Sequence, residues 1–332
     1  MIPDDITSIG EFAFSGRSSL TSITIPNGVT SIGSSAFNGC NLLNGIDIPN
    51  GVTSIGSAAF KNCSSLESIV IPKGVAEIYA WTFGGCSSLT SLTIENGVSV
   101  IGYHAFDGCS SLTNFTIPNS VTTVEEGAFA YCDSLTSIVI PNSVTSIGVN
   151  AFTTCRNLQN ITLSNSLTAI SYGVFSTCFS LKSVVIPEGV TTIEARAFAD
   201  CRELETITIP NSVTSIGESA FEGCELLASI IIPENVTSIG DSAFSRCNSL
   251  TSITIPENVT SIGEYTFYYC DLTSITIGNG ITRISDRAFM GCYLLKTVYY
   301  TGSEEQWNNI IIGELENEYL LTANIVYNYV AE

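Results

Sequence analysis

Phenylalanine recurs through almost the whole chain at a fixed step, and this periodicity constrains the fold more than any other feature. Every step in the series is 23 residues except the last, which is 22. The series consists of Phe14, Phe37, Phe60, Phe83, Phe106, Phe129, Phe152, Phe175, Phe198, Phe221, Phe244, Phe267 and Phe289. A fixed period of about 20 to 50 residues is typical of repeat proteins, whose units stack on one another. The sequence therefore predicts a stack of similar coils.

Cysteine and proline keep to the same repeat. All 12 cysteines fall three places after a phenylalanine, from Cys40 to Cys292, and all 10 prolines share one register. The single short step follows Cys270, where one residue is missing before Leu272. We therefore take residues 1–300 as thirteen 23-residue repeats, the first incomplete and one shortened by this deletion. Residues 301–332 are expected to form a C-terminal cap.

One unit, Leu20 to Cys40, reads LTSITIPNGVTSIGSSAFNGC. Apolar spacings of two and three are typical of short strands joined by turns. We expect a strand at Ser22 to Ile25, a turn at Pro26 to Gly28, a second short extended segment at Val29 to Ile32, and a helical or 3-10 turn at Ser34 to Asn38. The inward positions are Leu20, Ile23, Ile25, Val29, Ile32, Ala36, Phe37 and Cys40. One coil buries too little apolar surface to fold alone, so neighbouring coils must stabilise one another.

The unit LxxIxIPxxVTSIGxxAFxGCxSL resembles the BspA-like, Treponema-type leucine-rich repeat, found chiefly in surface or secreted proteins of bacteria and of some parasitic protists. The resemblance covers about residues 1 to 300, and the tail from Val298 to Ile310 resembles the end cap of gut-bacterial members. It implies a right-handed leucine-rich repeat solenoid with a concave parallel β-sheet and turns on the convex side. It also implies an association with adhesion to host or matrix proteins.

One repeat position departs from ordinary leucine-rich repeats. Their asparagine ladder would fall at Gly28 and its equivalents, but asparagine stands there only at Asn235 and Asn258. Most other coils carry glycine or serine. We therefore expect a different group to bind the backbone in most coils.

The two ends of the chain read differently. Glu304 to Ile312 is expected to form a short helix with Trp307 and Ile310 facing the last coil, and Asn324 to Tyr329 a final strand. At the other end, Met1-Ile2-Pro3 aligns with the middle of a repeat. We therefore expect the native protein to continue upstream, in a part that would hold any signal peptide; none is visible in this chain.

Twelve cysteines raise the question of disulfides or zinc. Each coil contributes one cysteine, so their side chains form a ladder near the coil spacing, too far apart for a sulfur–sulfur bond. A line of thiols also cannot enclose a tetrahedral ion. We predict buried, reduced, structural cysteines that pack as small hydrophobic residues. No metal and no cofactor is predicted, because the carboxylates are scattered and no Asp-rich loop recurs.

Charge and hydropathy limit the partners. With 11 Lys and Arg against 31 Asp and Glu, the net charge is -20. A nucleic acid backbone would be repelled, so nucleic acid is not an expected partner. No apolar run reaches the roughly 18 residues of a membrane-spanning helix, so no transmembrane segment is expected in this chain.

The sequence predicts no enzyme. Acid–base catalysis needs carboxylates or basic residues gathered on one face. The outward rows of the first strand instead carry mainly Ser, Thr, Asn and Val, and His104 is the only histidine. A row of threonines from Thr30 to Thr260 suggests an ice-binding surface, but paired columns are absent and β propensity already favours threonine.

Residues that break the repeat consensus are the candidate ligand-binding residues. Trp81 and His104 share one repeat position on adjacent coils, with tyrosines close by. The first cluster comprises Tyr79, Trp81, Tyr103, His104 and Tyr131, and the second comprises Tyr265, Tyr268, Tyr269 and Tyr293. Exposed Trp and Tyr are favoured binding residues. The alternative is that these rings only cover gaps beside small neighbours.

Two functions remain open at this point. The first is a non-enzymatic surface or secreted adhesion module that binds a protein or glycan ligand, such as a host matrix protein; the cell-surface or secreted location rests on the family resemblance. The second is a structural spacer or stalk that presents flanking segments. The sequence does not indicate the ligand, the oligomeric state or the mode of anchoring.

Overall fold

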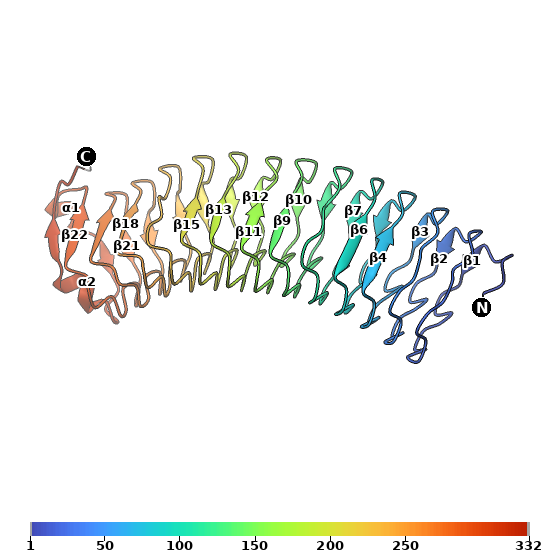
Figure 1. Ribbon diagram of the computed structural model, residues 1–332. Coiled ribbons are helices and arrows are strands. Elements are labelled where there is room, and N and C mark those ends of the chain that lie inside the picture. Colours follow the sequence, from blue (N-terminus) through green and yellow to red (C-terminus); the bar gives the residue numbers. More distant parts are fainter. Residues whose placement is uncertain (1, 331–332) are drawn as a thin grey trace. The chain divides into compact units, whose positions relative to one another are not determined.

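The computed structural model describes residues 2–330, and the chain forms two compact units, residues 1–167 and 168–332. In each unit the coils stack so that equivalent strands lie side by side and in parallel (Figure 1). Most coils contribute to two rows of strands, one from each extended segment of the repeat, although the first segments at residues 114–117 and 229–232 form no regular strand. The predicted fold class, a leucine-rich repeat solenoid, is confirmed.

Within residues 2–167 the first unit contains eleven strands. The first segments form two separate sheets here, one with β4 (Ser68–Ile71) and β6 (Ser91–Ile94) and one with β9 (Ser137–Val139) and β11 (Asn160–Thr162). The ladder of second segments holds β1 (Ser8–Ile9), β2 (Ser31–Ile32), β3 (Ser54–Ile55), β5 (Glu77–Ile78), β7 (Val100–Ile101), β8 (Thr123–Val124) and β10 (Ser146–Ile147). The strand expected at Ser22 to Ile25 is reduced to an isolated parallel bridge between Ser22 and Gly45.

The second unit repeats this arrangement. First segments form β13 (Ser183–Val185), β15 (Thr206–Thr208), β18 (Ser252–Ile255), β20 (Ser274–Ile277), β22 (Thr297–Tyr300) and β24 (Asn324–Val326). Second segments form β12 (Ala169–Ile170), β14 (Thr192–Ile193), β16 (Ser215–Ile216), β17 (Ser238–Ile239), β19 (Ser261–Ile262), β21 (Arg283–Ile284) and β23 (Ile311–Ile312).

The one-residue deletion leaves both ladders in register. Strands β18 and β20 pair Ser252 with Ser274, and β19 and β21 pair Ser261 with Arg283, each at a spacing of 22 residues. Elsewhere the spacing is 23, as between Ser31 and Ser54. The missing residue therefore lies outside the paired segments.

A stack of phenylalanine rings runs through the core of each unit. In the first unit, neighbouring rings from Phe14 to Phe152 lie nearly parallel, with centroids 5.1 to 5.4 Å apart. In the second unit the rings from Phe175 to Phe289 are 5.2 to 5.9 Å apart. Offset stacking of this kind adds to the gain from burial alone. The phenylalanines that recur every 23 residues thus form the centre of the core.

The cysteine ladder lies beside these rings, and its predicted burial is confirmed. The thiols of Cys63 and Cys86 donate to the carbonyl oxygens of Phe37 and Phe60 at 3.2 Å, and the same bond recurs along each unit. Burial, with a smaller contribution from the adjacent Cys40 thiol, raises the pKa of Cys63 to about 12. These side chains are neutral thiols in the interior at ordinary pH.

The segment around each phenylalanine differs in detail from the expected helical or 3-10 turn. Bonds from residue i+3 to residue i are present, such as Ala36 N–H to Gly33 O at 3.2 Å. They alternate with bonds to the next coil, such as Ser35 N–H to Ser57 O at 2.9 Å. Ser35 stands at φ 54, so the helical path is interrupted two residues before Phe37. The result is a chain of turns, because every second N–H bonds to a neighbouring coil.

Two rows of side-chain hydrogen bonds join the coils near the second ladder. In the threonine row, the hydroxyls of Thr53 and Thr214 donate to the carbonyl oxygens of Thr30 and Thr191 at 3.3 and 3.2 Å. These hydroxyls thus join adjacent coils and stabilise their stacking. At the repeat position where ordinary leucine-rich repeats carry asparagine, the Asn235 side chain donates to Asn211 O at 2.7 Å. In other coils a serine at this position donates to a backbone carbonyl, as in the bond from the Ser120 hydroxyl to Val98 O at 2.6 Å. The expected substitute for asparagine is therefore serine in several coils.

The end of the second unit combines helices with strands. Helix α1 (Glu304–Asn308) begins at a capping box in which Ser303 and Gln306 bond to each other's backbone N–H, and it buries Trp307. The expected helix to Ile312 is shorter, because Ile311–Ile312 pairs with β21 as strand β23. Helix α2 (Glu318–Thr322) has no counterpart in the sequence prediction. Strand β24 pairs with β22, so the segment extends both ladders.

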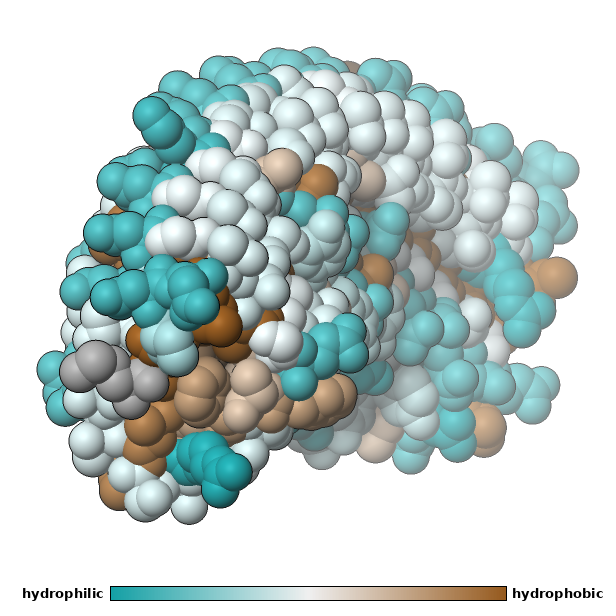
Figure 2. All heavy atoms as spheres, turned by 90° about the vertical axis from the view of Figure 1, so that its right-hand side faces the viewer, coloured by the Kyte–Doolittle hydropathy of each residue, from teal (hydrophilic) through white to brown (hydrophobic). Residues whose placement is uncertain are grey.

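Apolar side chains lie open beside β1. A hollow of about 280 Å3 is lined there by residues that include Ile2, Ile6, Phe14 and Ile23. Figure 2 shows hydrophobic residues gathered at this end of the molecule. Within the described part of the chain no coil packs on this side, so Leu20 and Ile23 are more exposed than their equivalents Leu66 and Ile69.

Candidate functional site

Three of the aromatic side chains predicted in the first cluster lie in direct contact. The rings of Trp81 and His104 are parallel within 6°, with centroids 4.5 Å apart. The Tyr103 ring meets His104 edge-on at 4.2 Å and 78°, and it meets Trp81 at 6.1 Å. We call Trp81, Tyr103 and His104 the aromatic stack. Trp81 and His104 are half-buried, and Tyr103 is 41% exposed.

The backbone explains why Trp81 and His104 project together. Both occupy the left-handed position two residues before the core phenylalanine, at φ 59 and φ 50. Equivalent positions on adjacent coils lie in register, so their side chains stack as the core rings do. A Cβ on Gly84 would lie 2.7 Å from the Trp81 ring, and one on Gly127 would strike the His104 ring. The two rings lie flat on the coil surface because glycine leaves room beneath them.

Charged groups surround the aromatic stack. The Lys61 ammonium lies 3.8 Å from the centroid of the Trp81 ring, a cation–π contact. His104 Nδ1 contacts the Asp107 carboxylate. Partial burial raises the pKa of Asp107, although the hydrogen bond and the charge of His104 and the charge of Lys61 act in the opposite direction. The Trp81 ring is thus contacted over its face by the Lys61 cation and stacked on the His104 ring.

Tyr79 and Tyr131 are not part of the stack. They are 39% and 51% exposed, and neither has a ring partner among residues 2–330. Tyr131 stands two residues after Phe129, at a second left-handed position with φ 58. The structure therefore reduces the predicted first cluster from five residues to three in contact.

The second predicted cluster forms a continuous row of rings in the second unit. Tyr265 meets Tyr268 at 5.5 Å, Tyr268 meets Tyr269 at 4.5 Å, and Tyr269 meets Tyr293 at 5.8 Å, all nearly edge-to-face. Helix α2 adds Tyr319, 5.0 Å from Tyr293. Sequence reasoning missed Tyr319, because it lies outside the repeats. All four predicted tyrosines are thus brought together.

Hydrogen bonds and arginines fix this tyrosine row. Tyr293 Oη donates to Tyr269 Oη at 3.4 Å, and this bond, with lesser effects of burial and nearby groups, raises the pKa of Tyr293 to about 12. Arg287 lies 5.8 Å from the Tyr265 ring and pairs with Glu264 at 3.0 Å. Arg246 lies over Tyr268 at 5.7 Å beside an open hollow of about 250 Å3. The row is therefore held more rigidly than Tyr131.

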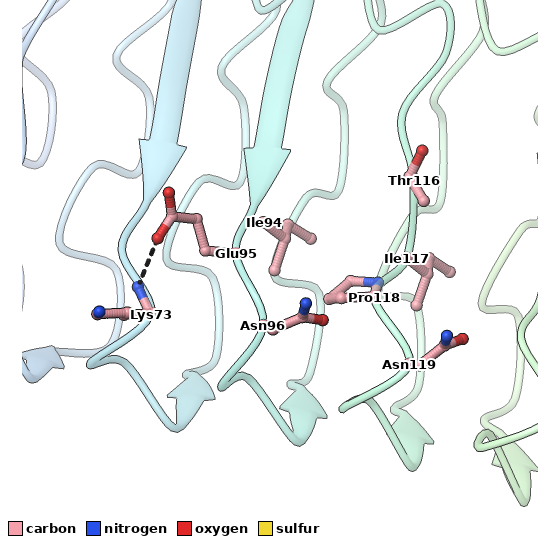
Figure 3. Close-up of a pocket in the computed structure, with 8 residues that line it drawn as sticks. All are labelled: Lys73, Ile94, Glu95, Asn96, Thr116, Ile117, Pro118 and Asn119. Atoms are coloured by element: carbon pink, nitrogen blue, oxygen red, sulfur yellow. Dashed lines mark hydrogen bonds between the residues drawn. The ribbon is translucent and has the colours of Figure 1, made fainter.

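A hollow of about 610 Å3 in the first unit was not predicted. Figure 3 shows its lining residues on neighbouring coils, including Lys73, Glu95, Asn96 and Asn119. Glu95 stands where most coils carry proline, and its carboxylate accepts a hydrogen bond from Lys73 N–H at 3.3 Å. The break in the proline register was the available sequence signal. The hollow offers amide and carboxylate groups to a polar ligand.

Across residues 2–330, no three His, Cys, Asp or Glu side chains are grouped as ligands for one metal ion. In the same part of the chain, neither five-residue helix has the length or the apolar character to cross a bilayer.

Comparison with known proteins identifies a leucine-rich repeat family and similar solved structures. The model described as "BspA type Leucine rich repeat region (6 copies)" matches residues 1–112, 76–201 and 168–296. A leucine rich cell surface protein from Faecalibacterium prausnitzii A2-165 is 36% identical, with 92% of this chain and 86% of that chain covered and a TM-score of 0.61. No curated protein shows significant similarity to the chain.

Two more distant structures share the fold. The pneumococcal vaccine antigen PcpA is 20% identical, with 98% of this chain and 85% of that chain covered and a TM-score of 0.61. A leucine-rich repeat protein from Eubacterium ventriosum is 23% identical, with 95% and 85% covered and a TM-score of 0.52. At these identities the likeness concerns the fold alone.

Proposed function

This chain belongs to the BspA-type leucine-rich repeat family, and from that premise we propose that it is a non-enzymatic binding module of the bacterial cell surface that recognises a protein or glycan ligand. The surface location is supported by the Faecalibacterium prausnitzii relative, which is described as a leucine rich cell surface protein. A net charge of -20 disfavours nucleic acid and anionic membranes as ligands. A host matrix protein with a basic patch is an electrostatically suitable partner.

The aromatic stack is the observation that carries this proposal. Most outward positions of the repeat hold small neutral side chains, whereas Trp81, Tyr103 and His104 present three touching rings on two adjacent coils. Large aromatic side chains held in one conformation lose little entropy on binding and therefore act as anchors. The rings are already held by one another and by Lys61, so the surface is preorganised.

A spacer or stalk is the second candidate function. The uniform rows of Ser and Thr along the first strands favour it, because a long stretch of the surface carries no distinctive chemistry. In that case the aromatic rings would only cover the coil surface. The two functions differ in whether removing the rings changes binding to any ligand.

The test is a binding screen with a matched control. Wild type and the Trp81→Ala/Tyr103→Ala double variant are screened against an array of extracellular matrix proteins and glycans. Tyr172→Ala is the control, because Tyr172 stands at the same repeat position as Tyr103, is 39% exposed, and makes the same backbone bond, from its N–H to Glu194 at 2.8 Å. Its coil carries Gly173 at the position of His104, so it has no stack.

We expect at least one selective ligand whose affinity falls tenfold or more in the double variant and stays unchanged in the control. Truncating a central aromatic anchor commonly costs about 2 kcal/mol or more, which corresponds to more than tenfold in affinity. Equal binding by all three proteins to every ligand would remove the stack as the binding site. No binding by the wild type would leave the spacer function as the better account.

A further inference from the structure

A groove on the sheet face of the second unit has a chemistry unlike that of the aromatic clusters. It has a volume of about 490 Å3 and lies over β18, β20 and β22. Its lining includes Ser229, Ile231, Glu234, Ser252, Thr254, Ser274, Thr276, Tyr299 and Tyr329. This volume is within the range of small-ligand sites, about 300 to 1,000 Å3. None of the candidate residues predicted from the sequence lines it.

The floor of the groove is a ladder of hydroxyl groups. Ser252 pairs with Ser274 and Thr254 pairs with Thr276 across β18 and β20. Adjacent strands are about 4.8 Å apart, so equivalent hydroxyls repeat at that spacing. This step is close to the length of one pyranose ring in an extended glycan. A bound chain running across the strands would therefore meet the floor at similar points on successive units.

These hydroxyls are available to a ligand. Within residues 2–330, the side chains of Ser252, Ser274, Thr254 and Thr276 make no hydrogen bond to another protein group. The threonines near the second ladder differ, because hydroxyls such as that of Thr214 donate to a carbonyl of the previous coil. The floor hydroxyls thus have their full hydrogen-bonding capacity free for water or sugar hydroxyls.

One wall of the groove is built by two tyrosines. The rings of Tyr299 and Tyr329 lie 4.5 Å apart at 38°. The chain after β24 is bonded to the end of β22 and the residues that follow it, with Asn328 N–H bonded to Gly302 O at 2.8 Å and Tyr329 N–H bonded to Tyr300 O at 3.0 Å. Aromatic rings of this kind offer a rigid face and a hydroxyl at low entropic cost. The wall is therefore fixed before any ligand arrives.

The opposite side supplies an apolar contact and one carboxylate. Ile231 is 83% exposed at a position where most other coils carry threonine or valine and where the last coil carries Tyr299. Glu234 also lines the groove on this side. The lining residues include no Lys or Arg, so a sulfated, phosphorylated or uronic ligand would lack a counter-charge and be repelled by Glu234. The C–H face of a neutral sugar suits both Ile231 and the tyrosine rings.

We propose that this groove binds a neutral, unbranched glycan, with Tyr299 and Tyr329 as the stacking wall and the serine and threonine hydroxyls as the floor. The proposal rests on the binding function proposed above, to which it adds a ligand class and a second site in the other unit. It does not involve the aromatic stack. The two sites can therefore be tested by separate variants of the same protein.

The experiment measures binding of defined oligosaccharides by isothermal titration calorimetry. The neutral probes are cellohexaose, mannohexaose, xylohexaose and laminarihexaose, and the anionic probes are hexagalacturonate and a heparin hexasaccharide. Tyr329→Ala tests the wall, and Thr254→Val with Ser252→Ala tests the floor, since both floor residues are exposed and the changes keep the side chains small. Tyr172→Ala and Thr214→Val are controls outside the groove, and circular dichroism checks that each variant is folded.

We expect at least one neutral probe to bind, with affinity reduced tenfold or more by the wall variant and by the floor variant but not by the controls. Binding of anionic probes alone, neutral binding that the groove variants leave unchanged, or no binding of any neutral probe at millimolar concentration would each overturn the proposal. Loss of binding in Trp81→Ala/Tyr103→Ala with full binding in the groove variants would place the activity on the aromatic stack instead.

Discussion

The thiol of Cys86 donates a hydrogen bond to the carbonyl oxygen of Phe60, 26 residues earlier, at 3.2 Å. Both residues are fully buried, and the same pair of positions recurs along each unit. The bond joins the two periodic features of the sequence, and it gives a second donor to a buried carbonyl that already accepts a hydrogen bond from Cys63 N–H at 3.1 Å. The cysteine ladder therefore acts as a row of small hydrogen-bonding core residues, and its protonation state affects stability.

Stability should fall as the pH rises above 9. Cys63 has an ordinary pKa of 9.0 and a pKa of about 12 in the folded protein, because burial disfavours the thiolate. Below pH 9 the thiol is protonated in both the folded and the unfolded chain, and its contribution to stability is fully present. Between pH 9 and 12 only the unfolded chain loses this proton, so the free energy of unfolding decreases. The slope should be about 1.4 kcal/mol per pH unit for each such thiol. Urea denaturation at pH 8, 9.5 and 11 measures this slope. The Cys63→Ala variant should show a slope smaller by the contribution of one thiol, and an unchanged slope in this variant would contradict a raised pKa for Cys63 in the folded protein.

The phenylalanine stack predicts a large and local loss of stability. Phe106 lies between Phe83 and Phe129 at 5.3 Å on each side. Phe106→Ala should cost about 3 to 5 kcal/mol because it leaves a cavity and breaks two ring contacts. Phe106→Leu, which keeps most of the volume, should cost much less. Hydrogen exchange should show faster exchange in the adjoining coils for the alanine variant, and equal costs for the two variants would argue against the stack.

The left-handed position before each core phenylalanine predicts opposite effects at two neighbouring alanines. Ala58 has φ 55 and is only half-buried, so Ala58→Gly relieves steric strain and should leave stability unchanged or raise it by up to about 1 kcal/mol. Ala59 is fully buried, so Ala59→Gly should destabilise by about 1 kcal/mol. Thermal unfolding of the two variants checks this, and a destabilising Ala58→Gly would contradict the assigned conformation.

The two kinds of threonine hydroxyl can be separated by a matched pair of substitutions. Thr214 donates to Thr191 O at 3.2 Å, so Thr214→Val should cost about 0.5 to 1 kcal/mol. The Thr254 hydroxyl makes no hydrogen bond to another protein group within residues 2–330, and Thr254→Val should change stability by less than about 0.5 kcal/mol. Chemical denaturation measures both. The reverse order would show that the groove floor is structural.

The repeat made the fold predictable because every coil repeats the same inward positions. It also predicted that Trp81 and His104 are neighbours, since equivalent residues stack in register. The left-handed turns were only partly predictable. Gly127, Asn150 and Gly173 occupy this position in three coils, as the conformation favours, but Ser35, Ala58 and Trp81 occupy it without such a signal. Hydrogen bonds to the next coil, such as that from Ser35 N–H to Ser57 O, hold these turns. Local residue propensities carry no information about such bonds between coils.

The hollow beside Glu95 and the groove beside Tyr329 were missed for different reasons. Glu95 carries a signal, because it interrupts the proline register, but its effect depends on the turns of three neighbouring coils. Tyr329 lies outside the repeats, and its position depends on its backbone bond to Tyr300 at the end of β22 and on its contact with the Tyr299 ring. Contacts made by a segment without a repeat cannot be inferred from the repeat.

The shortened coil after Cys270 shows where this architecture can vary in length. Both ladders stay in register there, because the lost residue lies between the cysteine and the next leucine. Chain length at this place is uncoupled from strand pairing and from the ring stack. The segment between the cysteine and the next leucine is therefore where we expect a change of length to be tolerated while the strands stay paired. That site is the natural entry point for grafting a new loop onto the scaffold.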